Sequence, residues 1–420
     1  MIKDIKIISK KYHIKESNKL EVALKHGAYS AIKRGFEIGS NGIYEEVNKS
    51  GLRGKGGGGA PAGAKWKLLL KPDARPKYLV VNSDESEPGT FKDRTILEKD
   101  PHLLIEGIIL TCYAIGANNA YVYIRGEYAM PAKILQNAID EAYNAGILGK
   151  KVMGYDFSLD VTIHRGAGAY ICGEKSALLE SLEGKRGHPR LKPKGKEPEW
   201  YFGNPTLVNN VETIASVPFI VENTGDEYKK YGTSESPGTL LFGISGHVNN
   251  PGIYEAPFGT PMIDYINEFA GGVRGGKKLK AVIPGGSSCA VLTADEVKKA
   301  TLDYETMQSL GSSLGTGGMI VMDEDTDMVA VLKNLMGFYH HESCGQCTPC
   351  REGTGWIDRT LEKIIKKEGT EDDIKILLKT ADTMNGKTIC VFAPAVSTVV
   401  YNFIKKFRSE FENYLGQKNG

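Results

Sequence analysis

The pattern of apolar and polar positions divides the chain into regions of different character. Up to about residue 70 the sequence is charged and weakly helical, and it leads into a glycine-dense loop. Beyond it, short apolar runs alternate with longer stretches of helical periodicity. The predicted strands are 77–82, 120–125 and 161–165, and the predicted helices are 103–116 and 131–145. This alternation favours an α/β layer fold with a largely parallel sheet.

The pattern changes again near residue 238. Strand-like runs at 240–246 and 281–283, a turn at 249–252 and one short helix at 265–270 predict a small β-rich domain. From residue 327 to the end the periodicity predicts a helical bundle, with helices over 328–339, 356–367, 372–384 and 395–407. We therefore expect four regions, at 1–70, 71–237, 238–325 and 326–420.

Composition narrows the class of protein. A chain of 420 residues is too long for a single hydrophobic core, and 41% hydrophobic with 25% charged residues is typical of globular proteins. The net charge of +2 gives no reason to expect nucleic acid or an anionic membrane as a partner. The start of the sequence has no signal-peptide pattern, and no apolar run reaches membrane-spanning length. We expect a cytoplasmic protein that reaches the cytoplasmic face of a membrane only through partner subunits.

Cysteine spacing carries the most specific chemical signal. Cys344, Cys347 and Cys350 stand at overlapping C-x2-C-x2-C spacing, and Cys390 lies on a separate segment. Three thiolates in one run and a distant fourth are typical of a [4Fe–4S] cluster. The alternatives are a structural zinc site, which usually takes two separated C-x2-C pairs, and chance. The other cysteines, 112, 172 and 289, fit a reducing compartment better than a disulfide framework.

The glycine-dense loop, residues 51–66, predicts a phosphate site. Glycines let the backbone approach a ligand and turn successive N–H groups towards phosphate oxygens, and Arg53, Lys55 and Lys65 add positive charge. The alternative is a flexible linker. No predicted strand precedes the loop, so its formal G-x-G-x-x-G is not a dinucleotide fingerprint.

Other polar groups gather at predicted strand ends. Asp84, Glu85 and Glu87 follow the strand at 77–82, either as ligand-binding groups or as a solvated acidic loop. A second glycine cluster at 166–180 leads from a strand into a helix whose N-terminus can receive an anion, with Tyr170 placed to cover a ring. Asn209 and Asn210 either bind ligand phosphate or cap the helical run that follows.

Together these segments resemble the flavin-binding, NADH-oxidising (51 kDa-type, F) subunit of respiratory complex I, with its relatives in NAD-linked hydrogenases and formate dehydrogenases. The resemblance covers about residues 45–400. The matching segments are Leu52–Gly57, Asn82–Arg94, Arg165–Glu174, Asn209–Thr213, Gly246–Glu255, Leu314–Met322 and Ser343–Arg351.

The resemblance implies a Rossmann-like FMN domain, a ubiquitin-like β-grasp domain and a helical bundle carrying a [4Fe–4S] cluster on Cys344, Cys347, Cys350 and Cys390. Hydride would pass from NADH to FMN, and single electrons from FMN to the cluster. A thioredoxin-like [2Fe–2S] subunit and further Fe–S subunits would be the partners. Glu85 and Glu87 would face the nicotinamide. The implied cofactor-binding residues are Gly54, Gly56, Gly57, Lys65, Asn82, Asp84, Tyr170, Gly173, Glu174, Lys175, Asn209, Asn210 and Thr213.

The chain departs from the family at the adenosine end of NADH. Three aromatics that stack on adenine are replaced by Ala60, Leu68 and Gly195, and a glutamate that faces the ribose is replaced by Lys175. Three functions therefore stay open: an NADH dehydrogenase subunit, an NADPH-preferring variant in which Lys175, Lys194 and Lys196 attract the 2′-phosphate, or an FMN/Fe–S subunit that exchanges electrons with a protein partner instead of a nicotinamide. A purely structural role is disfavoured by the intact FMN and cluster motifs.

Overall fold

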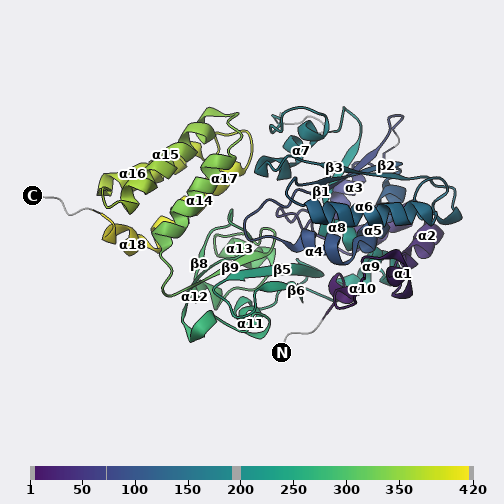
Figure 1. Ribbon diagram of the computed structural model, residues 1–420, viewed down its shortest axis with the longest axis horizontal. Coiled ribbons are helices and arrows are strands. Elements are labelled where there is room, and N and C mark those ends of the chain that lie inside the picture. The colour runs from purple at the N-terminus through teal and green to yellow at the C-terminus, as the bar shows by residue number, and fades with distance from the viewer. Residues whose placement is uncertain (1–4, 72, 192–199, 416–420) are drawn as a thin grey trace, which may run out of the picture.

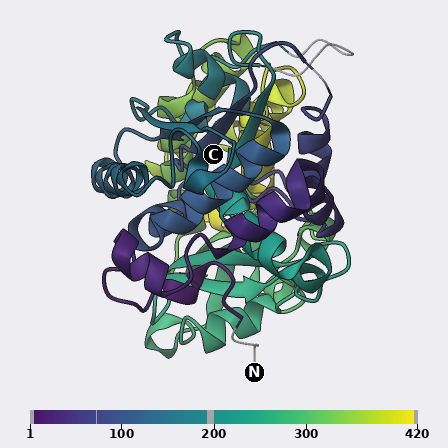
Figure 2. The ribbon, with the colours of Figure 1, turned by 90° about the vertical axis from the view of Figure 1, so that its right-hand side faces the viewer.

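The computed structural model describes residues 5–71, 73–191 and 200–415. Figure 1 shows an α/β domain on the right, a small β-rich domain below the centre and a helical bundle on the left. Turned by 90°, the molecule presents its N-terminal helices in front, with the bundle behind them (Figure 2). No described helix is long and apolar enough to cross a membrane.

The sheet of the α/β domain is parallel throughout its described strands. These are β1 (Tyr78–Ser83), β2 (Asn119–Ile124), β3 (Asp160–Arg165) and β4 (Thr206–Asn210), in the order β3-β2-β1-β4. The first three confirm the predicted strands, whereas β4 was not predicted. The chain runs from β1 to β2 and β3 on one side and then crosses from β3 to β4 on the other side of β1, and the register places Asn82 beside Asn210. Such a reversal opens a crevice at the carboxyl ends of the strands.

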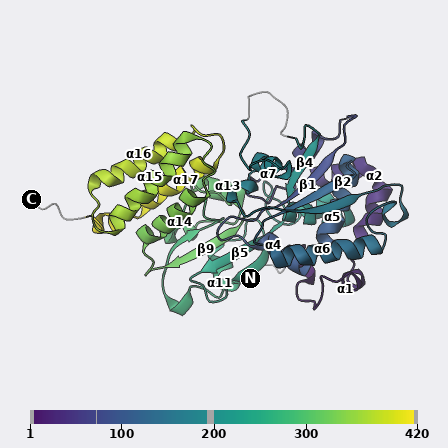
Figure 3. The same ribbon diagram turned by 45° about the horizontal axis from the view of Figure 1, so that its top comes forward.

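Helices cover both faces of this sheet (Figure 3). Leu79 and Val81 belong to a core shared with α2, α5, α6 and α9, while Val80 between them packs on the opposite face with α7. Alternate residues of β1 are thus buried on opposite sides, which explains why its middle, from Leu79 to Val81, is apolar without a break. The helices are α1 (Leu20–Lys25), α2 (Ser30–Lys49), α3 (Ala62–Lys67), α4 (Lys92–Lys99), α5 (Pro101–Ile115), α6 (Ala129–Asn144), α7 (Lys175–Leu182), α8 (Val211–Ala215), α9 (Val217–Asn223) and α10 (Gly225–Lys229).

The β-grasp domain has a mixed sheet of order β6-β5-β9-β7-β8, in which β5 and β9 run parallel. Its strands are β5 (Thr239–Gly246), β6 (Gly252–Pro257), β7 (Leu279–Ile283), β8 (Leu292–Thr293) and β9 (Gly318–Asp323). The expectation of one helix was wrong: α12 (Ala294–Val297) and α13 (Tyr304–Ser309) accompany α11 (Met262–Glu268). Thr293 caps α12 through a reciprocal bond with Glu296, a local signal that the apolar pattern does not contain.

The bundle consists of α14 (Met328–Glu342), α15 (Thr348–Ile365), α16 (Glu371–Met384), α17 (Phe392–Lys406) and the short α18 (Arg408–Asn413). α15 begins well before the predicted Trp356, so Cys350 lies on its first turn. The apolar core of the bundle continues through the β-grasp residues Ile283 and Met322 to Val80 of β1. The bundle is therefore packed onto the α/β domain by a continuous apolar contact.

Candidate functional site

Two cavities open at the crevice between β1 and β4. The larger, of about 250 Å³, is lined by the loop after β1, by the short 3-10 helix η3 (Tyr170–Gly173) and by the start of α17. The smaller, of about 160 Å³, is lined by the glycine-dense loop and the end of β4. Both are lined by Gly56, Asn82, Gly173 and Asn210, so they form one elongated site.

Nearly all the predicted cofactor-binding residues line this site. The larger cavity brings together Gly56, Asn82, Asp84, Glu85, Glu87, Tyr170, Gly173, Glu174 and Asn210. The smaller adds Gly54, Lys65, Lys175, Asn209 and Thr213. Gly57 lines neither of them; its φ of +109° and its closeness to Thr316 give it a conformational reason to be glycine.

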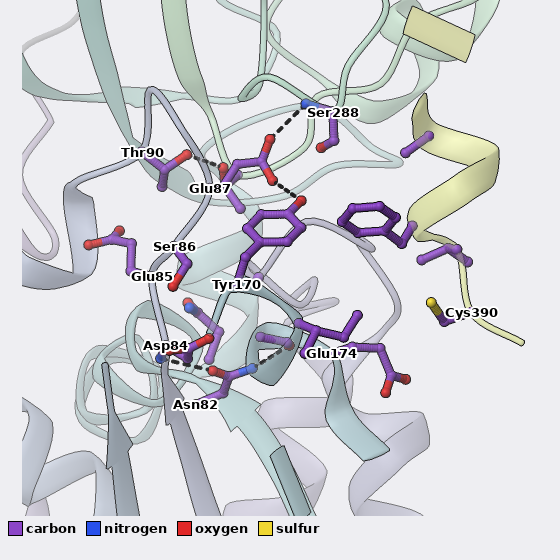
Figure 4. A pocket seen from close by; sticks show the side chains of 18 of the residues that line it. Asn82, Asp84, Glu85, Ser86, Glu87, Thr90, Tyr170, Glu174, Ser288 and Cys390 are labelled. Carbon is purple, nitrogen blue, oxygen red and sulfur yellow. Dashed lines mark hydrogen bonds between the residues drawn. The ribbon is translucent and has the colours of Figure 1, made fainter. Parts of the chain in front are cut away.

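Asn82 fixes the shape of the larger cavity (Figure 4). Its amide donates to the carbonyl of Gly173 at 2.9 Å, and its Oδ1 accepts from the backbone N–H of Asp84 at 3.0 Å. The side chain thus joins the end of β1 to η3 and to the turn that carries the acidic residues. A residue at this position orients the walls of the site as well as lining it.

Asp84 is a buried acceptor facing the cavity. Its side-chain oxygens have no hydrogen-bonding partner among the described residues. Burial raises the pKa of this carboxyl group to about 7. A buried acceptor without a partner costs free energy unless a ligand donates to it, so the cavity fits a ligand with hydroxyl groups, such as the ribityl chain of FMN.

Glu85 has a carboxylate that points away from the cavity (Figure 4). It accepts from the backbone N–H groups of Asp93 and Arg94 at 2.8 and 2.9 Å and from the Tyr128 hydroxyl at 2.9 Å. Burial, together with the negative charge of Asp93, raises the pKa of Glu85. These bonds hold the start of α4, so the carboxylate of Glu85 fixes the position of this helix beside the cavity.

Glu87 joins separate parts of the chain at the cavity wall. Tyr170 donates its hydroxyl to Oε2 at 2.6 Å, while Ser287 and the backbone N–H of Ser288 donate to Oε1 at 3.1 and 2.7 Å (Figure 4). Ser287 also bonds Tyr339 of α14 at 2.6 Å. One carboxylate thereby connects the α/β domain to the β-grasp domain directly and to the bundle through Ser287.

The structure corrects the prediction that Arg53, Lys55 and Lys65 all offer positive charge to a phosphate. Lys55 is buried and turned inward to Glu212 and Ser216, at 3.2 and 2.8 Å. Arg53 bonds Glu305 at 2.9 Å and lies over the ring of Tyr304. Lys65 lines the smaller cavity, and within the described ranges it has no ion pair. Of the three, Lys65 is thus the cation available to a phosphate.

The amides at the end of β4 combine the two roles that the sequence left open. Asn210 caps α8 by accepting from the N–H of Glu212 at 3.0 Å, and it also lines both cavities. Asn209 accepts from the indole of Trp66 at 3.0 Å, and Thr213 accepts from the N–H of Lys55 at 2.9 Å. These bonds secure the glycine-dense loop, so it is a fixed structure rather than a linker.

The four predicted cluster ligands lie around one small space, here called the cysteine cavity. Cys344, Cys347, Cys350 and Cys390 line it, between the α14–α15 loop and the start of α17, with a volume of about 10 Å³. Among the described residues, no three Cys, His, Asp or Glu side chains are grouped to hold a single metal ion, so the thiols surround the cavity rather than converge on a point. Burial raises the pKa of Cys350 to about 12 and that of Cys390 to about 11. The thiols of these two residues are therefore protonated in the metal-free chain, and binding a metal to them would release those protons.

Of the residues that line both the larger cavity and the cysteine cavity, the sequence singled out only Cys390. Ile171, Cys390 and Phe392 line both the larger cavity and the cysteine cavity. Ile171 follows Tyr170, and Phe392 stands two residues after Cys390. Their closeness to predicted site residues was the available signal, but an isolated apolar residue is more often part of a core.

Only some of the residues that depart from the family pattern line the site, as the sequence predicted for all of them. Ala60 and Lys175 line the smaller cavity. Leu68 is an exposed side chain that lines neither cavity of the site. Gly195, with Lys194 and Lys196, lies outside the described residues.

A site with a glycine-lined anion end, a buried carboxylate for hydroxyl groups and a wall shared with four thiols defines a flavin- and iron–sulfur-containing electron-transfer protein. Family models agree with the fold: residues 47–219 match the Nuo51 FMN-binding domain, 240–331 the SLBB domain and 330–414 the NADH-ubiquinone oxidoreductase-F iron-sulfur binding region. The chain belongs to the family of the F subunits of NADH-quinone oxidoreductase.

Two curated relatives, both named as the F subunit of NADH-quinone oxidoreductase, show the extent of the similarity. The protein of Rickettsia bellii is 48% identical over 402 residues, 96% of each chain, and that of Rickettsia felis is 47% identical over 413 residues, 98% of each. Among solved structures, the air-oxidized NAD+-reducing [NiFe]-hydrogenase superposes with a TM-score of 0.84 at 36% identity, over 92% of this chain. The present chain spans 65% of that hydrogenase chain.

Proposed function

We propose that this chain is the electron-input subunit of a complex I-like oxidoreductase. It takes hydride from NADH onto FMN and passes single electrons to a [4Fe–4S] cluster. The observation that carries this function is the pair of adjoining cavities, which share Ile171, Cys390 and Phe392. A flavin accepts two electrons at once and releases them one at a time, so it requires a one-electron acceptor close by.

The side chains hold and orient the cofactor rather than exchange protons with substrate. Lys65 and the N–H groups of the glycine-dense loop would hold the phosphate of FMN, and Asp84 would accept from its ribityl hydroxyls. Asn82, Gly173 and Asn210 join the two ends of the site. Cys344, Cys347, Cys350 and Cys390 would each give one thiolate to the cluster.

Partners follow from the same assignment. The electron that reaches the cluster must leave it again before the next one arrives, and a second protein with its own redox centre would accept it. We infer a multi-subunit complex with a thioredoxin-like [2Fe–2S] subunit and further Fe–S subunits, through which any membrane contact is made.

The test begins with cofactor content and ends with nicotinamide. Anaerobically prepared protein should hold FMN noncovalently and about four irons per chain. Addition of NADH should then bleach the flavin absorbance and reduce the cluster. Acid-released flavin that runs as FAD, or protein that takes up no flavin, would contradict the assignment.

A second candidate function rests on the smaller cavity. Ala60 and Lys175 line it where the family has an aromatic and a glutamate. These two replacements weaken the binding of adenosine. They favour either a subunit that oxidises NADPH or a subunit that binds no nicotinamide. Titration with NADPH beside NADH separates these functions: bleaching by NADPH alone supports the first, and no bleaching by either supports the second.

A further inference from the structure

The larger cavity and the cysteine cavity are separated by a thin wall. Ile171, Cys390 and Phe392 line both. Cys390 is a predicted cluster ligand, so an isoleucine and a phenylalanine are the other two residues that line both cavities.

The ring of Phe392 is held in place by residues from different parts of the fold. It meets the rings of Tyr170 and Tyr339 nearly edge-on, with centroids 5.7 and 5.5 Å apart. The Tyr170 hydroxyl is bonded to Glu87, and the Tyr339 hydroxyl to Ser287. Edge-to-face contacts restrict orientation, so the ring has little freedom to leave the wall.

Solvent comes close to this wall from outside. Val391, the residue before Phe392, is 76% exposed, whereas Phe392 is 7% exposed. Both line the larger cavity. Exposure thus falls steeply over one peptide unit, from a residue at the surface to the ring that lines both cavities.

We propose that Phe392 is a positioning residue that keeps water out of the junction between the two redox centres. The inference rests on the proposed function only for the presence of FMN and the cluster. The step it serves is the passage of one electron from NADH-reduced FMN to the oxidised cluster, in which no bond to the protein forms or breaks. The reduced cluster carries more negative charge than the oxidised one, and water stabilises the more charged form.

Phe392→Ala should therefore raise the midpoint potential of the cluster and speed its loss of iron to a chelator such as bipyridyl. The potential is measured by EPR-monitored titration with dithionite, without nicotinamide. Phe392→Leu, which restores an apolar barrier, should return the potential and the chelation rate towards wild type.

Phe338→Ala is the matched control. Phe338 packs edge-on against Tyr170 and Tyr339, with centroids 5.3 and 5.2 Å apart, but lines neither cavity. Its removal deletes a ring from the same aromatic group without opening the wall. Equal potentials and chelation rates in Phe392→Ala and Phe338→Ala would overturn the proposal.

A second pair of variants covers the case in which Phe392→Ala fails to assemble. Phe392→Val and Phe392→Thr have the same shape but differ in attraction for water, and the potential should be higher in the threonine variant. Identical potentials in this pair would show that the wall does not act by keeping water out. Wild-type protein that loads no flavin or no iron would overturn the proposed function as well, whereas loaded variants with unchanged potentials would overturn this inference alone.

Discussion

Lys55 and Glu212 form a buried ion pair beneath the two cavities, with 3.2 Å between Nζ and Oε1. The other oxygen of Glu212 lies 3.0 Å from the Nζ of Lys92 on α4. The backbone N–H of Leu241, on β5, donates to the same carboxylate at 2.9 Å. Glu212 thus compensates Lys55, shares the compensation of Lys92 with Asp93, which lies 2.7 Å from the same ammonium, and connects the glycine-dense loop to the β-grasp domain.

Removing this charge should destabilise the protein strongly. Glu212→Gln leaves Lys55 without its ionic partner in a buried setting, and breaking one side of a buried pair costs about 3–5 kcal/mol. Urea unfolding of the cofactor-free protein measures the change. Glu227→Gln, which breaks the solvent-exposed pair with Lys230, is the control and should change the free energy of unfolding far less. Equal effects of the two substitutions would refute the compensating role of Glu212.

Asp84→Asn should stabilise cofactor-free protein at pH 8 relative to wild type. Burial raises the folded-state pKa of Asp84 to about 7, above its unfolded value. The favourable contribution of the protonated form is therefore full below about pH 4 and is lost as the pH rises through 7. The advantage of the variant should grow between pH 4 and pH 8, on the order of a few kcal/mol at about 1.36 kcal/mol per pKa unit. Thermal unfolding of the wild type and the variant at pH 4 and pH 8 measures this difference in stability.

The same substitution should weaken FMN binding. An asparagine offers one carbonyl acceptor where the carboxylate offers two charged oxygens, and a charge-assisted hydrogen bond is worth about 1.5–3 kcal/mol. Flavin fluorescence quenching on titration of the cofactor-free protein measures Kd. A variant that gains stability at pH 8 and binds FMN as tightly as wild type would show that Asp84 does not contact the flavin.

Cys350→Ser should lose most of the iron. Cys350 is the most buried of the four cysteines around the cysteine cavity. When serine replaces it, no other ligand can easily take the place of the lost thiolate. Iron and acid-labile sulfide are assayed after anaerobic reconstitution. Cys112→Ala, in the core of α5, should keep its iron. Stoichiometric zinc without iron in wild-type protein would count decisively against a cluster.

Lys175→Glu should shift cofactor preference from NADPH towards NADH. An ammonium attracts a 2′-phosphate and a carboxylate repels it, a difference of about 1.5–3 kcal/mol for a direct contact. Ala60→Phe should tighten binding of both cofactors through stacking, by about 0.5–1.5 kcal/mol. The measurement is kcat/KM for each cofactor with an artificial acceptor. Lys298→Glu, at an exposed ion pair remote from the cavities, controls for surface charge. An unchanged ratio in Lys175→Glu would remove that residue from cofactor selection.

The pattern of apolar and polar positions predicted the helices of the bundle and strands β1 to β3. Strand β4 was not predicted because Thr206–Asn210 is short and ends in two asparagines, which are more common in caps and turns. Its position at the edge of the sheet, beside β1, is set by a pairing between residues far apart in sequence. No local pattern contains that pairing.

The site was predictable to the extent that backbone chemistry defines it. Glycines 54 and 56, Asn82 and Asp84 line the cavities because strand ends and glycine loops bring them there. The direction of a charged side chain depends on partners elsewhere in the fold. Lys55 and Lys65 belong to the same loop, yet Glu212 draws one inward and the other stays at the cavity. The sequence of the loop alone does not distinguish them.

The shared wall also bears on biosynthesis. The glycine-dense loop and β4 are synthesised by residue 213, whereas Phe392 and Ala395, which complete the larger cavity, are synthesised much later. At about 5–20 residues per second this gap lasts on the order of tens of seconds. During that time a nascent chain offers flavin a site with one side open to water. Stable insertion of the flavin therefore awaits synthesis and docking of the bundle, so cofactor loading is a late step in the maturation of this subunit.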